Sequence, residues 1–154
     1  MKVRSSTLSD GNEIPQSMVY SGMGHSGQNR SPHLEFLDVP AGTKSFAVVM
    51  HDPDAPTSGG FYHWVLFNIP GSTRELREGS APGTSGHTDF GTREYGGPAP
   101  PSGPAHRYNI TVYALDAEHL PLDESTTGAK LELMAGQHTL DKATIAGRYG
   151  TGNL

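Results

Sequence analysis

Three short apolar segments dominate the hydrophobic pattern of this chain. They span residues 46–50, 62–69 and 107–115. The first contains two consecutive valines and is typical of a buried strand, whereas the third alternates apolar and polar positions as a half-buried strand does. Pro53 follows the first segment closely and has no backbone N–H, so regular strand pairing is expected to stop near it. The pattern therefore predicts three central strands.

Weaker patterns flank these segments. An edge strand is expected within residues 2–8, a short strand within 14–20 and a single helical turn at 74–78. From Thr126 onward the apolar spacing changes and alanines raise the helix propensity, so the pattern predicts helix, which Gly136 splits in two and Gly147 ends.

The composition favours a β protein over a helical bundle. Hydrophobic residues make up only 34% of the chain, which contains 20 glycines and 12 prolines, as expected for short strands joined by many turns. The length fits one domain over residues 1–154. The long Pro/Gly stretch at 96–104 is interpreted as a loop and not a linker, because too little chain follows it to build a second core.

Charge and cysteine content exclude several function classes. The formal net charge is −5 and no basic stripe is present, which argues against nucleic acid or an anionic membrane surface as a partner. The absence of cysteine excludes disulfides, thiol catalysis and iron–sulfur clusters. No signal-peptide pattern and no apolar run of membrane-spanning length is found, so a cytoplasmic protein without integral membrane contact is expected.

Acidic and histidine side chains gather where the predicted strands begin or end. Asp52 and Asp54 follow the first strand, His63 opens the second and His106 opens the third. A carboxylate beside imidazole favours the charged imidazolium, and backbone N–H groups of a glycine-rich loop can complete an anion site. His63 and His106 are then expected to donate hydrogen bonds to the anion. The alternative, that each histidine only satisfies a strand end, stays open at this point.

Two other chemistries are weaker. Asp-x-Asp with two histidines could suit a divalent cation, but the usual histidine spacings are missing and Pro53 makes the acidic segment unlike a calcium loop, so no metal is expected. No serine lies in a Gly-x-Ser-x-Gly elbow, and we expect no enzyme and no cofactor. The alternative is a protein that uses the same Asp/His cluster either as a hydrolase, to activate water, or to modulate a protease or kinase.

Several motifs in this order resemble the phosphatidylethanolamine-binding protein family, which includes Raf kinase inhibitor protein, and specifically its bacterial branch. The matching segments are Ser31-Pro32-x-Leu34, Asp52-Pro53-Asp54-Ala55-Pro56, His63-Trp64, Thr88-Asp89-Phe90-Gly91, Tyr95-Gly96-Gly97-Pro98-Ala99-Pro100-Pro101 and His106-Arg107-Tyr108. The resemblance covers nearly the whole chain. It implies a mainly β fold: a large antiparallel sheet packed on a smaller one as a β-sandwich, with a C-terminal helix.

The resemblance also implies a small pocket for phosphate or a phosphorylated head group, and a cis peptide bond before Pro56. The candidate ligand-binding residues are Asp52, Asp54, Pro56, His63, Tyr95, Gly97, Pro100, His106 and Tyr108. The family suggests a regulatory binding protein with a kinase or protease partner. The sequence leaves open whether the chain forms a homodimer.

Overall fold

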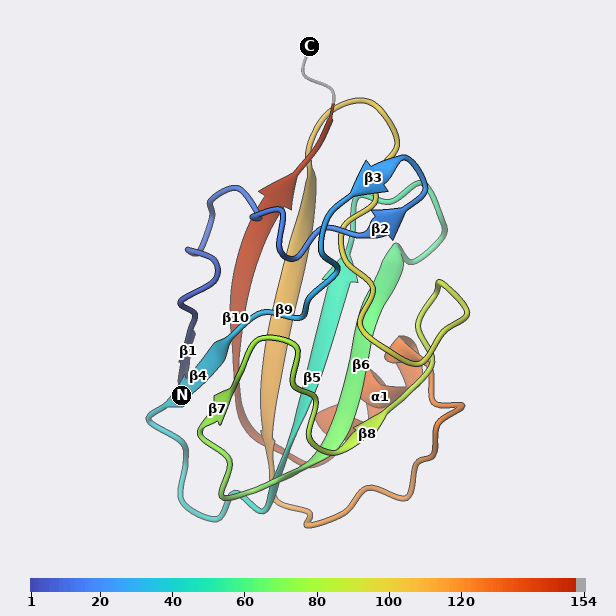
Figure 1. Cartoon of the computed structure of the whole chain (residues 1–154). Helices are drawn as coiled ribbons and strands as arrows, with labels where there is room; N and C mark the ends of the chain where they lie inside the picture. The colour runs from blue at the N-terminus through green and yellow to red at the C-terminus, as the bar shows by residue number, and fades with distance from the viewer. Residues whose placement is uncertain (152–154) are drawn as a thin grey trace.

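A five-stranded antiparallel sheet forms the centre of the protein. The computed structural model describes residues 1–151. The sheet has the strand order β10-β9-β5-β6-β8. Its strands are β5 (Ser45–Asp52), β6 (Phe61–Pro70), β8 (Thr84–Ser85), β9 (His106–Leu115) and β10 (Thr139–Tyr149). Figure 1 shows β5, β6 and β9 side by side, with β10 at one edge. The three central strands predicted from the pattern are confirmed, and β5 ends at the residue before Pro53.

A smaller sheet covers one face of the large sheet. It contains β1 (Lys2–Arg4), β4 (Leu34–Leu37) and β7 (Glu75–Leu76) in the order β1-β4-β7. Its inward side chains join those of the large sheet in one buried cluster, for example Phe36, whose ring centroid lies 4.8 Å from that of Phe46. A separate hairpin of β2 (Ser21–Gly22) and β3 (His25–Ser26) lies near the end of the large sheet at which β5 ends.

Within residues 1–151, one helix covers the opposite face of the large sheet. Helix α1 (Gly128–Gly136) begins after Thr127, whose side chain accepts a hydrogen bond from the backbone N–H of Lys130 as an N-cap. Leu131 and Ala135 are fully buried and pack in a second cluster with apolar residues of β5 and β6. Within residues 1–151 the structure therefore has a large sheet, a smaller sheet, the two-stranded β2–β3 sheet and one helix. The two packed sheets and the C-terminal helix that the family resemblance implied are confirmed.

The second predicted helix is wrong, because its residues form strand β10. Its eleven residues pair along almost their whole length with β9, from Thr139 opposite Leu115 to Tyr149 opposite His106. Towards its end the strand alternates between buried and exposed residues, and the backbone hydrogen bonds of the ladder outweigh the modest helix propensity of Ala143 and Ala146.

Three weaker predictions also need correction. The segment 74–78 contains strand β7 instead of a helical turn, because it pairs with β4. Residues 14–20 form turns instead of a strand, closed by hydrogen bonds from Met18 N–H to the Pro15 carbonyl and from Val19 N–H to the Gln16 carbonyl. The first edge strand is shorter than residues 2–8 and ends at Arg4.

In the described part of the chain, residues 1–151, no helix combines the length and apolar character needed to cross a membrane.

Candidate functional site

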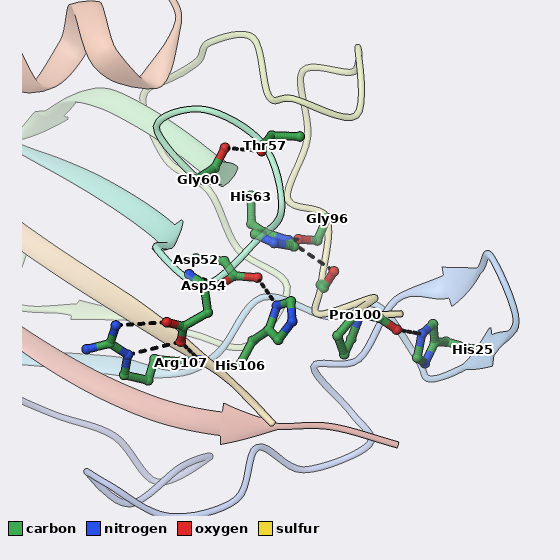
Figure 2. Close-up of polar contacts among 11 residues, drawn as sticks. His25, Asp52, Asp54, Thr57, Gly60, His63, Gly96, Pro100, His106 and Arg107 are labelled. Atoms are coloured by element: carbon green, nitrogen blue, oxygen red, sulfur yellow. Dashed lines mark hydrogen bonds and ion pairs between the residues drawn. The ribbon is translucent and has the colours of Figure 1, made fainter. Parts of the chain in front are cut away.

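A cavity opens where the end of β5 meets the beginnings of β6 and β9. These ends coincide because β5 pairs antiparallel with both neighbours. The cavity has a volume of about 200 Å³ and mostly apolar walls. It is lined by Met23, Asp52, Ala55, Pro56, Thr57, Phe61, His63, Phe90, Ala99, Pro100, Pro101, His106 and Tyr108. Figure 2 shows Asp52, His63 and His106 together at this end of the sheet.

Asp52 and His106 form a hydrogen-bonded pair at the base of this site. Asp52 is only 2% exposed, and its Oδ2 lies 2.7 Å from Nδ1 of His106. Its other oxygen, Oδ1, accepts the backbone N–H of Asp54 at 2.8 Å. A carboxylate facing Nδ1 places a proton on that nitrogen and fixes the ring orientation. Nε2 of His106 is thereby left for a ligand.

His63 owes its position to a β-bulge. Met50 pairs with Trp64 and His51 pairs with Tyr62, so His63 is the additional residue between them. The bulge turns His63 and Trp64 towards the same side of the sheet, where the His63 ring lies 5.3 Å from the Tyr108 ring and Trp64 joins the larger core cluster. Regular alternation would have placed these neighbours on opposite faces.

The protonation state of His63 differs from the sequence expectation. Its Nδ1 lies 2.8 Å from the Gly96 carbonyl oxygen and 3.1 Å from that of Gly97, so Nδ1 must be the donor. Burial lowers the pKa of His63 to about 4. The ring is therefore neutral near pH 7, and its Nε2 accepts hydrogen bonds instead of donating them. The expectation of two cationic histidines is corrected for this residue.

Tyr108 presents a buried hydroxyl that has no hydrogen-bond partner within residues 1–151. The residue is 1% exposed and lines the cavity. Burial raises the pKa of Tyr108, so the group stays a neutral phenol that can donate. Leaving such a group unpaired costs about 1–3 kcal/mol, which a polar ligand atom in the cavity would recover.

Asp54, one of the predicted ligand-binding residues, lies outside the cavity. Its carboxylate accepts three hydrogen bonds from Arg107, from the backbone N–H at 2.8 Å, from Nε at 3.0 Å and from Nη2 at 2.8 Å. The hydrogen bonds from Arg107 lower the pKa of Asp54 to about 2. Asp54 therefore ties the turn after β5 to the first residues of β9.

Tyr95 and Gly97, two of the predicted ligand-binding residues, are not among the residues that line the cavity. The Tyr95 hydroxyl donates to the Met18 carbonyl at 2.9 Å, and its ring packs edge-on against Trp64. The Gly97 N–H donates to Asn29 Oδ1 at 2.7 Å and is not available to a ligand. Gly97 was predicted to bind the ligand. Instead its carbonyl accepts a hydrogen bond from His63 and so helps to hold that ring in place.

The remaining predicted residues, Asp52, Pro56, His63, Pro100, His106 and Tyr108, all line the cavity. The peptide bond before Pro56 is trans, as are all peptide bonds of the described chain, so the expected cis bond is not found. The trans form is intrinsically preferred.

Met23 lines the cavity, and the sequence analysis did not predict it as a site residue. Met23 is 71% exposed at the tip of the β2–β3 hairpin, whose His25 Nε2 lies 3.0 Å from the Pro100 carbonyl oxygen. No local sequence pattern predicts this contact between the hairpin and Pro100. Phe90 was visible only as part of a motif, and its ring packs against those of Phe61 and His63.

Within residues 1–151, no group of three or more histidine and acidic side chains is arranged to hold a metal ion.

Comparisons with known proteins agree with this architecture. The family model for phosphatidylethanolamine-binding protein matches residues 4–150. UPF0098 protein YbhB of Escherichia coli K12 is 45% identical over 157 residues, covering 97% of this chain and 99% of that protein. A UPF0098 protein of Aquifex aeolicus is 44% identical over 156 residues, covering 97% of this chain and 88% of its own length.

Solved structures show the same fold. The crystal structure of Escherichia coli YbcL, described as a new member of the mammalian PEBP family, superposes with a TM-score of 0.94 at 37% identity, covering 97% of this chain and 98% of that one. CT736 of Chlamydia trachomatis superposes with a TM-score of 0.85 at 30% identity, covering 97% of each chain. The match to the family model and these similarities show that the chain belongs to the phosphatidylethanolamine-binding protein family.

Proposed function

We propose that this protein binds a small ligand with a phosphate-type anionic group in the cavity beside Asp52 and His106. The observation that carries the proposal is the buried hydroxyl of Tyr108, a residue of the cavity lining, which has no hydrogen-bond partner within residues 1–151. An anionic oxygen there would accept from this hydroxyl and, when His106 is protonated, from its Nε2–H. The apolar walls would accommodate the carbon part of the ligand.

Asp52 supports this role by holding His106. Its carboxylate fixes Nδ1 of the ring at 2.7 Å, so Nε2 is oriented before any ligand arrives. The buried charge of Asp52 is itself balanced when His106 is protonated. When protonated, Nε2 of His106 is thus a donor whose orientation is already fixed, so ligand binding loses little side-chain entropy.

We expect His106→Ala to weaken binding of O-phosphorylethanolamine by roughly 10- to 100-fold, the range for a hydrogen bond to a charged group. Calorimetric titration of phosphate, O-phosphorylethanolamine and acetate would measure this. Equal affinity in wild type and variant would contradict the proposal.

A hydrolase is the second candidate, because the Asp52–His106 pair resembles a general base held by a carboxylate. Ester, phosphoester and peptide substrates should be screened against wild type and His106→Ala. Turnover that disappears in the variant would favour catalysis. The cavity-lining hydroxyl of Thr57 donates to the Gly60 carbonyl at 2.6 Å, so such a hydrolase would activate water and not this side chain. We propose binding without catalysis, and turnover in the wild type would contradict that choice.

A cytoplasmic location is also proposed, on the cysteine-free composition, and cell fractionation would test it. A kinase or protease partner stays a prediction from the family resemblance, and the formation of a homodimer stays open. Light scattering of the purified protein would report the oligomeric state.

A further inference from the structure

A second cavity opens beside strand β8 and shares no lining residue with the cavity at Asp52 and His106. Its volume of about 420 Å³ lies within the range of about 300–1,000 Å³ that is usual for small-molecule sites. Its surface is mostly polar, whereas the walls of the first cavity are mostly apolar. The polar residues of its lining include Gln28, Arg30, Ser31, Ser85 and Glu94. A ligand that fills this second cavity is therefore expected to be polar.

Hydrogen bonds between distant segments of the chain fix the walls of the second cavity. The Gly79 N–H donates to the Ser31 carbonyl at 3.0 Å. The Asn29 side chain donates to the Tyr95 carbonyl at 3.4 Å and accepts from the Gly97 N–H at 2.7 Å. Because these bonds exist without a ligand, binding would require little ordering of the walls.

Ser31 is a buried polar residue of this lining. It begins the Ser31-Pro32-x-Leu34 segment and is only 5% exposed. Its carbonyl accepts from Gly79, but within residues 1–151 no hydrogen bond involves its hydroxyl. A ligand atom in the cavity would give this hydroxyl a partner.

Two opposite charges lie on neighbouring parts of the wall. Arg30 and Glu94 both line the cavity, and each is next in the chain to one member of the hydrogen-bonded pair Asn29 and Tyr95. The guanidinium of Arg30 has one contact within residues 1–151, from Nη1 to Glu78 Oε1 at 3.5 Å, so it retains N–H groups for a carboxylate. Glu94 forms no ion pair within residues 1–151 and can accept from an ammonium group.

We infer that the second cavity binds a small zwitterion, an amino acid or a short peptide, through its carboxylate and ammonium groups. Arg30 and the Ser31 hydroxyl donate to the carboxylate, and Glu94 accepts from the ammonium group. A ligand with only one kind of charge would leave the opposite charge of the wall without a partner. This site is separate from the proposed anion site and does not depend on it.

L-Alanyl-L-alanine, its N-acetyl derivative and its C-terminal amide form a matched set of probes, because each blocked form lacks one of the two charges. Calorimetric titration of the wild type at about pH 7 and low salt is expected to show saturable binding of the dipeptide. Each blocked form should bind roughly 10- to 100-fold more weakly, the range for a hydrogen bond to a charged group. L-Alanine, titrated in parallel, distinguishes a free amino acid from a peptide as the better source of the zwitterion.

Arg30→Gln and Glu94→Gln test the two contacts separately, and both side chains are exposed, so the fold should tolerate the changes. Arg30→Gln is expected to bind the dipeptide and its amide equally, within about twofold, because the carboxylate has lost its charged partner. Glu94→Gln is expected to lose the preference over the N-acetyl form for the corresponding reason. Arg77→Gln is the matched control: Arg77 is exposed but does not line the cavity, so both preferences should persist.

Several results would overturn this inference. They are the absence of saturable binding of either zwitterion at millimolar concentration, equal binding of the dipeptide and its blocked forms to the wild type, and preferences that persist in both variants. Dipeptide binding that survives in Arg30→Gln and Glu94→Gln but is lost in His106→Ala would assign the dipeptide to the first cavity and also contradict the inference. Phosphate binding beside His106 is measured with different probes, so the proposed function stands or fails independently.

Discussion

Gly97→Ala is expected to lower the free energy of unfolding by about 3 kcal/mol, at the upper end of the usual cost of overpacking. A Cβ at this position would lie 1.9 Å from the Met18 carbonyl oxygen and 2.8 Å from the Tyr20 nitrogen. Neither backbone atom can yield freely, because Tyr20 N–H donates to the Pro98 carbonyl at 3.0 Å and the Met18 carbonyl accepts from Tyr95 at 2.9 Å. Urea unfolding measured by fluorescence would determine the loss.

Gly136→Ala is the matched control for this substitution. Gly136 ends helix α1, and no heavy atom lies within 4 Å of a Cβ built there. Because alanine is the better helix former, the variant should be unchanged or more stable by up to about 1 kcal/mol. If Gly97→Ala unfolds at the same urea concentration as the control, the loop behind the cavity is not held by the contacts described above.

The stability of the protein is expected to fall by about 2.5 kcal/mol between about pH 8 and pH 4.5 through His63 alone. Burial holds the pKa of this histidine at about 4 in the folded protein. In the unfolded chain it returns to about 6.5, so the unfolded state binds more protons within this window. Protons therefore favour unfolding as the pH falls below about 6.5, and the loss is complete only below the folded pKa.

The measurement compares two proteins at two pH values. Urea unfolding of wild type and His63→Asn at about pH 8 and pH 4.5 gives a double difference in which the other titrating groups largely cancel. The variant is expected to be less sensitive to pH by about 2.5 kcal/mol, since asparagine does not titrate. Equal sensitivity in both proteins would show that His63 is protonated as easily in the fold as outside it.

The central strands could be read from the sequence because their patterns are local. The alternation within residues 107–115 puts Tyr108, Ile110, Val112 and Ala114 on one face of a strand, and all four are buried in the larger core cluster. The stop at Pro53 was equally local, because proline lacks the donor that a ladder needs. Strand β10 was misread because its alanines favour helix in isolation, and only the exposed edge of β9 offers it a partner.

Most of the candidate site could likewise be predicted from the sequence, and one of its residues could be assigned only from the structure. Asp52, His63 and His106 were predicted from their positions at strand ends and Tyr108 from the family resemblance, and the antiparallel pairing of β5 with β6 and β9 brings them to one cavity. Asp54 looked equivalent to Asp52 in the sequence. Only the structure shows that Arg107 binds it outside the cavity.

The sequence by itself determined the mainly β fold, the three central strands and the end of the sheet where the polar groups meet, because strand propensity and chain breaks are properties of short segments. The tertiary structure decided the chemistry of the site. The bulge at His63 depends on pairing with β5, its tautomer depends on carbonyls 33 and 34 residues away, and its neutral state depends on burial. Such contacts join segments that are distant in sequence, so no local pattern encodes them.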